Sequence, residues 1–147
     1  MYSTNNSVRV SEIMSSPVIT ASDSESIKSI AQKMNKYGIN SIIISDKSNT
    51  PIGMITERDI IRRLLTKKRN LLFAKAKHVM SKPVVTITKN MLLEEAAKLM
   101  VQKRIKKLCV VDEQNKIAGI ITESDIIKNA AYLIDVLKDM IDTGYQR

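Results

Sequence analysis

The sequence predicts an α/β (α+β) fold in which two β-α-β-β-α repeats pack through their sheets with pseudo-two-fold symmetry. The first observation is internal repetition: residues 13–63 align with residues 79–129 without a gap, and 17 of these 51 positions are identical. The second is that each copy alternates β-branched runs with apolar residues at helical spacing. The third is size, because a unit of about 60 residues exposes an apolar sheet face that only a second unit can cover.

The first half of each copy reads as a strand followed by a helix. A β-rich run after a proline predicts strands at residues 18–20 and 84–87. Apolar residues then recur at i, i+3, i+4 and i+7, which predicts a helix in each copy. These positions are Ile27, Ile30, Ala31 and Met34 in the first copy, and Leu93, Ala96, Ala97 and Met100 in the second. The spacing of Ser22 and Glu25 is that of a capping box at the first helix.

The second half of each copy reads as a hairpin followed by a helix. Strands are expected at residues 41–45 and 51–55, and again at 108–111 and 117–121. Polar turns at residues 46–50 and 112–116 separate them. A last helix is expected to start near Thr56 in one copy and near Thr122 in the other.

These elements divide the chain into four segments. The first repeat spans residues 8–65, a basic linker 66–78, the second repeat 79–130, and a C-terminal helix and tail 131–147. The last segment carries apolar residues at helical spacing, which predicts an amphipathic helix that packs on the core or on a partner chain. They are Leu133, Ile134, Leu137, Met140 and Ile141.

Composition and charge narrow the function classes. The chain has 24 Lys and Arg against 15 Asp and Glu, so its net charge is +9 and favours anionic partners. No apolar run approaches the roughly 18 residues that a membrane span needs, and Met1 to Val10 does not read as a signal peptide. The single cysteine, Cys109, favours a cytoplasmic location and a buried, inert thiol. One histidine, His78, gives little material for a metal site, and none is expected.

The best-matched stretch is Gly53 to Asp59, which repeats as Gly119 to Asp125. In both copies a strand is expected to end at a threonine where a helix begins, and free N–H groups there suit an anion. The aspartate three residues later can accept hydrogen bonds from ribose hydroxyls. The competing interpretation is a helix cap, because Thr-x-x-Asp is also a capping-box variant that needs no ligand.

The paired Met-Ser-x-Pro-Val openings, the β-α-β-β-α order and the twin Gly-h-h-Thr-x-x-Asp endings resemble the tandem CBS domain (Bateman module) family over about residues 8–130. The resemblance implies two clefts between the repeats that bind AMP, ADP, ATP or S-adenosylmethionine. It also implies a regulatory rather than catalytic protein, active in energy sensing, that acts on a partner protein and commonly forms a homodimer. No cofactor is required.

In that family each cleft takes the Thr and Asp from one repeat and the adenine-facing strands from the other. Carried over, the ligand-binding residues of the first cleft are Thr56, Asp59, Val84, Val85, Ile105, Lys106, Lys107 and Ser124. Those of the second cleft are Thr122, Asp125, Val18, Ile19, Ile39, Asn40, Ser41 and Arg58. The two lysines predict that the first cleft prefers more highly charged nucleotides than the second.

Two other function classes stay open at this point. The basic runs at residues 62–69 and 103–107 are compatible with binding of RNA or DNA backbone. Aromatic residues are only 3% of the chain, which leaves few stacking platforms for single strands. An enzyme is the weakest alternative, because no nucleophile with a positioned base is visible; no catalytic residues are assigned.

Overall fold

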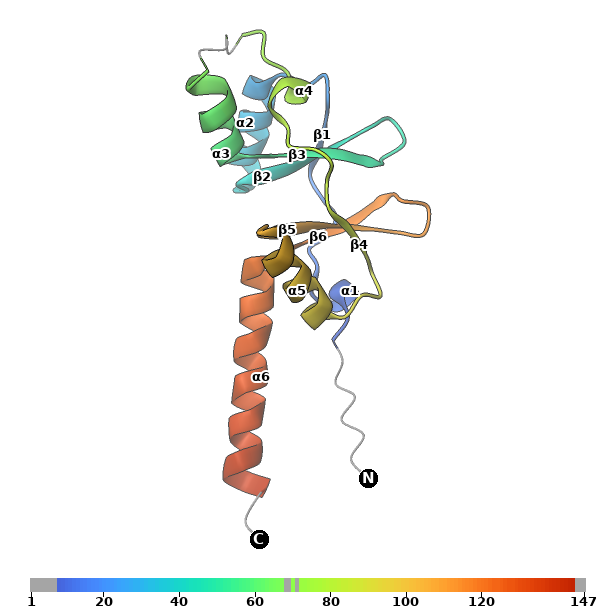
Figure 1. Cartoon of the computed structure of the whole chain (residues 1–147), viewed down its shortest axis with the longest axis vertical. Coiled ribbons are helices and arrows are strands. Elements are labelled where there is room, and N and C mark those ends of the chain that lie inside the picture. The colour runs from blue at the N-terminus through green and yellow to red at the C-terminus, as the bar shows by residue number, and fades with distance from the viewer. Residues whose placement is uncertain (1–7, 68–69, 71, 145–147) are drawn as a thin grey trace.

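The computed structural model describes residues 8–67, 70 and 72–144. Its helical elements are α1 (Val10–Ile13), α2 (Ile27–Tyr37), α3 (Glu57–Ile60), the π-helical turn η1 (Ile61–Leu65), α4 (Ala76–Val79), α5 (Leu93–Lys103) and α6 (Glu123–Gly144). Its strands are β1 (Thr20–Ser22), β2 (Ser41–Ser45), β3 (Pro51–Thr56), β4 (Thr86–Thr88), β5 (Lys107–Val111) and β6 (Ile117–Thr122). Figure 1 shows these elements in two stacked halves.

Each half contains one three-stranded sheet with the same topology. β2 lies between a parallel neighbour, β1, and an antiparallel neighbour, β3, and the order β4-β5-β6 repeats this arrangement. The registers repeat as well, since Thr20 pairs with Ile43 and Thr86 pairs with Cys109. The constant sequence offset is therefore a structural repeat, which confirms the predicted mixed fold of two similar units.

The two sheets face one another across a shared apolar layer (Figure 1). Successive side chains of a central strand point to opposite faces of its sheet, so that one strand contributes to two hydrophobic cores. Ile42 and Ile44 face the helices of the first half, whereas Ile43 contributes to the layer between the sheets. In the same way Leu108 faces the second helical core, and the fully buried Cys109 faces the layer between the sheets. Because both faces are covered, these strands read as nearly continuous apolar runs.

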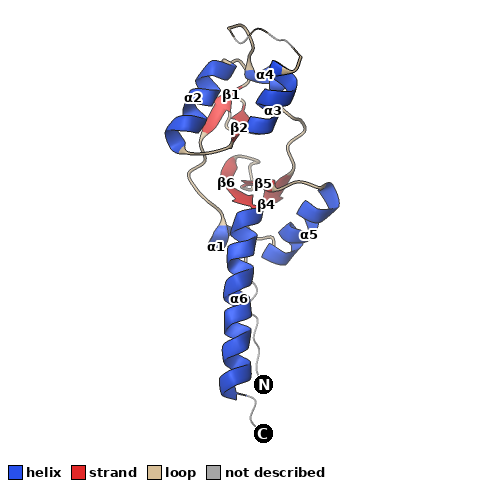
Figure 2. Ribbon diagram, turned by 90° about the vertical axis from the view of Figure 1, so that its left-hand side faces the viewer, coloured by secondary structure: helices blue, strands red, loops and turns tan. Residues whose placement is uncertain are grey.

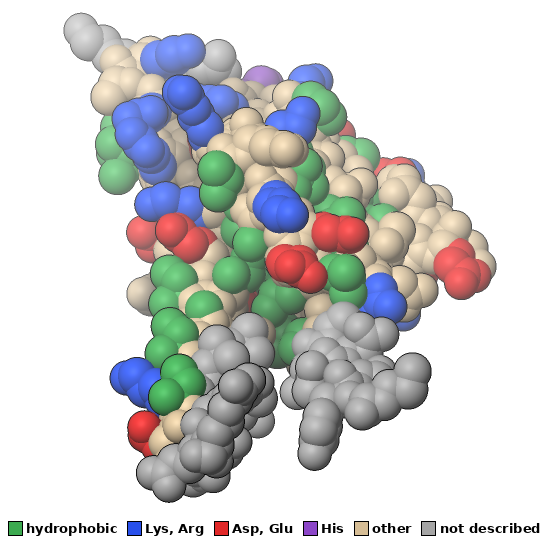
Figure 3. Space-filling model, turned by 60° about the horizontal axis from the view of Figure 1, so that its bottom comes forward, with side chains coloured by type: hydrophobic (Ala, Val, Ile, Leu, Met, Phe, Trp, Pro, Cys, Tyr) green, Lys and Arg blue, Asp and Glu red, His purple; other side chains and the backbone are tan. Residues whose placement is uncertain are grey.

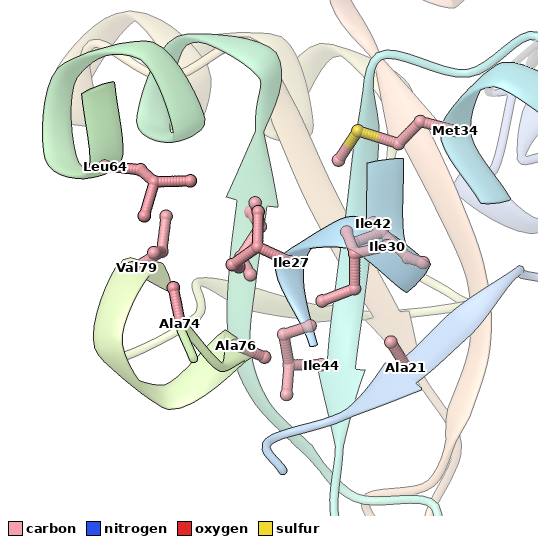
Figure 4. Close-up of a cluster of buried hydrophobic side chains, with 11 residues drawn as sticks. Ala21, Ile27, Ile30, Met34, Ile42, Ile44, Leu64, Ala74, Ala76 and Val79 are labelled. Carbon is pink, nitrogen blue, oxygen red and sulfur yellow. The ribbon is translucent and has the colours of Figure 1, made fainter. Parts of the chain in front are cut away.

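Two short helices cross from one repeat to the core of the other. α1 opens the first repeat, yet its Val10 is fully buried in the second core. α4 precedes the second repeat, yet its Ala76 and Val79 lie in the first core, where Figure 4 shows them beside Ile27 and Leu64. The chain continues this exchange at the sheet edges, where Ser15 pairs with Ile120 and Ser81 pairs with Met54. Each half is completed by a segment of the other repeat.

The two glycines of the repeated motif make room for this crossing. A Cβ built on Gly53 would lie 2.5 Å from the sulfur of Met80, and one built on Gly119 would lie 2.5 Å from the sulfur of Met14. At Gly119 the carbonyl oxygen of Ser15 is also only 3.1 Å away. A side chain at Gly53 would displace the side chain of Met80, and one at Gly119 would also press against the backbone of the crossing segment.

Some predicted boundaries differ from the structure. The strands after the prolines begin at Thr20 and Thr86, two residues later than predicted, because the residues just after the prolines lie outside the sheet ladders. The first long helix starts at Ile27, and its cap is Ser26, whose Oγ accepts a hydrogen bond from the N–H of Ser29 (3.1 Å). The predicted Ser22–Glu25 capping box is therefore wrong.

The C-terminal helix α6 leaves the body of the molecule and projects past α1 and α5 (Figure 2). Ile127, Ile134 and Ile141 recur every seven residues on it and are 60%, 53% and 67% exposed. Figure 3 shows apolar side chains along this helix and a gathering of Lys and Arg at the far end of the molecule. Among the described residues, no helix combines the length and the hydropathy needed to cross a bilayer.

Candidate functional site

A cavity of about 790 Å³ opens between the two halves, and residues of both repeats line it. Its volume lies in the ordinary range of small-molecule sites. The first repeat supplies most of its wall, from the segment before β1, α2, the start of β2, and α3. The lining residues are Ser15, Pro17, Val18, Ile19, Ala31, Met34, Asn35, Gly38, Ile39, Asn40, Ser41, Ile43, Glu57, Ile60, Ile61, Lys107, Ile120 and Thr122.

The cavity has apolar walls and a polar rim. Val18 and Ile43 lie in the layer between the sheets, and Ile19 and Ile39 pack on the first core. A flat heteroaromatic ring fits between such aliphatic surfaces because its burial removes apolar area from water. The polar residues of the lining are Ser15, Asn35, Asn40, Ser41, Glu57, Lys107 and Thr122. Hydroxyl and amide groups suit sugar hydroxyls, and an ammonium group suits an anion.

Lys107 is the cation of this cavity. Its Nζ donates hydrogen bonds to Oδ1 of Asn40 and to Oγ of Ser41, the latter at 2.8 Å. Burial lowers the pKa of the Lys107 ammonium group, and the neighbouring carboxylate of Glu57 opposes this effect. A half-buried ammonium group that is held by two neutral acceptors is well placed to receive an anionic ligand.

The Thr122–Asp125 pair forms a cap at the edge of the cavity. The carboxylate Oδ2 of Asp125 accepts hydrogen bonds from the N–H (2.9 Å) and from Oγ1 (3.0 Å) of Thr122. The N–H of Asp125 donates to Thr122 Oγ1 at 3.3 Å. In the described part of the chain, the hydrogen bonds to this carboxylate all come from Thr122, so Oδ1 is open to a further donor. The capping interpretation and the ribose interpretation are therefore compatible.

The first cleft has the same cap in a different setting. Asp59 Oδ2 accepts from the N–H of Thr56 at 3.0 Å, and the N–H of Asp59 donates to Thr56 Oγ1 at 3.1 Å. The other oxygen, Oδ1, lies 3.4 Å from the hydroxyl of Ser81 and 3.9 Å from Nε of Arg63. Protein groups thus approach both oxygens of Asp59.

Most residues predicted for the second cleft come together around the cavity: Val18, Ile19, Ile39, Asn40, Ser41 and Thr122. Asp125 is hydrogen-bonded to Thr122 but is not itself among the residues that line the cavity. Arg58 is exposed and does not line the cavity either. Of the residues predicted for the first cleft, Val84 lies in the layer between the sheets, whereas Val85 and Ile105 pack on the second core. Lys106 and Ser124 are exposed. Their roles in ligand binding stay predictions.

The structure places one residue differently from the expectation and adds others. Lys107 was expected in the first cleft, whereas it lines this cavity together with residues predicted for the second cleft. Strand alternation is the reason, since Lys107 shares a face with the buried Cys109 two residues later, and that face looks toward the other repeat. This strand alternation could have been recognised in the sequence. Nothing in the sequence indicated Glu57, Ile60 and Ile61, which lie on α3 and η1 and also line the cavity.

The single cysteine and the single histidine, which the sequence offers as reactive or metal-binding groups, both lie in surroundings that favour a structural role. Cys109 is fully buried, and burial raises the pKa of its thiol to about 11, which suits an inert core residue. His78 is exposed, and its Nδ1 accepts a hydrogen bond from the N–H of Lys75 at 3.1 Å. Among the described residues, no cluster of three or more His, Cys, Asp or Glu side chains is placed to hold a metal ion.

Comparison with known proteins agrees with this architecture. The family described as CBS domain matches twice, at residues 10–66 and 76–132. The uncharacterised protein MK0525 of Methanopyrus kandleri is 39% identical over 133 residues, which cover 90% of this chain and 68% of the relative. Inosine-5'-monophosphate dehydrogenase of Methanocaldococcus jannaschii is 32% identical over 84% of this chain, but the match covers only 24% of that enzyme.

Solved structures show the same fold. The CBS domain pair of protein MJ0100, in complex with 5'-methylthioadenosine and S-adenosyl-L-methionine, superposes with a TM-score of 0.77 at 29% identity. The match covers 85% of this chain and 97% of that one. A protein with CBS domains from Burkholderia ambifaria has a TM-score of 0.76 at 22% identity, over 84% of this chain and 93% of its own. The similarity to the Burkholderia ambifaria protein supports the fold alone.

Proposed function

The chain belongs to the CBS domain family, and we propose that it is a regulatory module that binds an adenosyl ligand and modulates a partner protein. The observation that carries the proposal is the 790 Å³ cavity, whose apolar walls and polar rim come from both repeats. The similar CBS domain pair of MJ0100 holds S-adenosyl-L-methionine and 5'-methylthioadenosine, which supports the ligand class.

In this proposal different residues of the second cleft bind the adenine, the ribose and the anionic group of the ligand. The adenine ring packs against Val18, Ile19 and Ile39. The ribose hydroxyls donate to the open carboxylate oxygen of Asp125. Lys107 exchanges its bonds to Asn40 and Ser41 for bonds to an anionic group, which is a phosphate of AMP, ADP or ATP or the carboxylate of S-adenosylmethionine.

Regulation follows from the position of the cleft between the halves. A ligand that contacts both repeats stabilises the arrangement in which the cleft is closed around it, and its differential affinity sets the size of the shift. The shift passes to a partner protein or to a second copy of the chain. In this proposal the module catalyses no reaction itself. It acts in the cytoplasm, and energy sensing is one form that its regulation takes.

A thermal-shift titration tests the proposal. AMP, ADP, ATP, S-adenosylmethionine, 5'-methylthioadenosine and a short oligonucleotide are each added at low and moderate salt. We expect a saturable rise in melting temperature with at least one adenosyl ligand, and a loss of that rise in Asp125→Asn. Glu113→Gln removes one exposed carboxylate elsewhere and serves as the matched control. Oligonucleotide binding that falls steeply with salt, without any adenosyl effect, would instead support the nucleic-acid alternative.

A further inference from the structure

Arg63 binds to the segment that crosses into the first half. Its Nη1 donates to the carbonyl oxygens of Val79 at 3.0 Å and Met80 at 2.9 Å. These two bonds fix the guanidinium group against the end of α4. From this position its Nε lies 3.9 Å from Oδ1 of Asp59, a carboxylate whose side chain is only 16% exposed.

The surroundings of Asp59 leave little room for a ribose. Oδ2 is used by the cap with Thr56, and Oδ1 faces the hydroxyl of Ser81 at 3.4 Å as well as Arg63. A ribose hydroxyl needs a free lone pair on Oδ1 and the space beside it. In the first cleft this hydroxyl would have to compete for Oδ1 with the hydroxyl of Ser81 and with the charge of Arg63.

The second half lacks this arrangement. The constant offset of 66 places Asn129 where the first repeat has Arg63. Asn129 is uncharged and too short to copy the contacts of an arginine. Among the described residues, Asp125 takes part in no ion pair and its carboxylate accepts hydrogen bonds from Thr122 alone. The arginine contact is therefore missing because the repeat has not kept this pair of positions identical, whereas Ser81 has an identical counterpart in Ser15.

We propose that Arg63 makes the clefts unequal, so that the adenosyl ligand occupies the second cleft and the first is held as a structural latch between the repeats. Arg63 is a specificity-determining residue in this view. It disfavours the ribose at Asp59 and fastens α4 to the first half at the same time. The inference rests on the proposed function and adds which of two similar clefts is used.

Titration calorimetry with S-adenosylmethionine and with ATP tests the inference. We expect about one equivalent of ligand per chain for the wild-type protein. Asp125→Asn should weaken binding by at least about tenfold, whereas Asp59→Asn should change it less than about twofold. Exchanging the distinguishing residues gives the sharper test: Arg63→Asn should open a second equivalent, and Asn129→Arg should weaken the single site.

The outcomes separate this inference from the proposed function. Two equal sites in the wild-type protein, or equal losses in Asp59→Asn and Asp125→Asn, would contradict the role of Arg63 while leaving nucleotide binding in place. A wild-type chain that binds none of the adenosyl probes would contradict the proposed function and this inference together. If Arg63→Asn is too unstable to titrate, Asn129→Arg still decides, because an unchanged affinity in that folded variant would overturn the proposal.

Discussion

Lys107 shows at the scale of a single residue how a strand position creates a binding group. Its neighbours Leu108 and Val110 are buried in the second core, so alternation turns Lys107 toward the other repeat. There its ammonium group meets Asn40 and Ser41 rather than solvent alone. The preference for highly charged nucleotides, which the sequence assigned to the first cleft, is therefore proposed for the second.

Replacing Lys107 by methionine tests this charge. The variant keeps most of the aliphatic length of the side chain but cannot bind an anion. We expect the affinity for ATP to fall by about tenfold or more, because a charge-assisted hydrogen bond contributes roughly 1.5–3 kcal/mol. Affinity for 5'-methylthioadenosine, which has no anionic group, should change little. Equal losses for both ligands in equilibrium binding would contradict the role of Lys107. Lys103→Met, at an exposed lysine assigned to neither cleft, is the matched control.

Glu25 gives a pH-dependent prediction. Burial alone would raise the pKa of Glu25, but hydrogen bonds from Lys33 and Ser29 and the charge of Lys33 lower it overall from 4.5. A lowered pKa in the folded state adds stability above pH 4.5, and this stability is lost as the pH falls through the lowered pKa. Glu25→Gln should therefore melt below the wild type at neutral pH, and the difference should shrink in acid.

The control for this pH prediction is Glu94→Gln, at an exposed carboxylate on α5. Melting curves of the three proteins between pH 7 and pH 3 provide the comparison. A difference between Glu25→Gln and the wild type that grows in acid would have the wrong sign for a carboxylate with a lowered pKa.

Some residue positions could be predicted from the sequence and others could not. Thr56 and Asp59, with their counterparts Thr122 and Asp125, were placed correctly as helix caps because capping depends on local spacing. Arg58 was carried over by resemblance to the second cleft; it is exposed and is not among the residues that line the cavity. A helix only four residues long gives no periodicity from which the direction of this side chain could be predicted.

Among the secondary-structure elements, the two short helices α1 and α4, which cross between the halves, are the main feature. α1 is joined to the second core by backbone hydrogen bonds from Val10 to Met91 (2.9 Å) and from Leu93 to Val8 (2.9 Å). The repetition itself was predictable because both copies share the same openings. The exchange was not, because a four-residue helix fits either core and the pattern of apolar residues does not say which one.

Truncating Val10 tests the exchange of α1. Val10→Ala removes two methyl groups from a fully buried site, so we expect a loss of about 2 kcal/mol in the free energy of unfolding. Amide hydrogen exchange should accelerate more in α5 and β5 than in α2 and β2. Loss of protection confined to α2 and β2, the half that follows α1 in sequence, would contradict the assignment.

At the scale of the whole molecule, exposed apolar side chains on the outer surface predict an interface with a second chain. Ile127, Ile134 and Ile141 form an exposed stripe with a spacing of seven residues, which is the pattern of a helix that packs on another helix. Ile61 and Leu65 add exposed apolar surface on the first half. We expect a homodimer that covers this surface.

Analytical ultracentrifugation of Ile134→Glu tests the dimer. A charge in the middle of the stripe should shift the protein toward the monomer without lowering its helical content. Lys128→Glu changes the charge of an exposed residue on another side of α6 and should leave the dimer intact. A wild-type chain that sediments as a monomer at micromolar concentrations would show that this stripe serves another contact.

We propose that the two halves act together through a ligand that lies between them in the cleft of Val18, Asn40 and Lys107. The most direct measurement is a crystal structure of the protein grown with S-adenosylmethionine. We expect density for an adenosyl group in this cleft, with the ribose on Asp125 and the anionic end near Lys107. Density for the ligand at Asp59 with the second cleft empty, or an empty protein at saturating ligand, would contradict it.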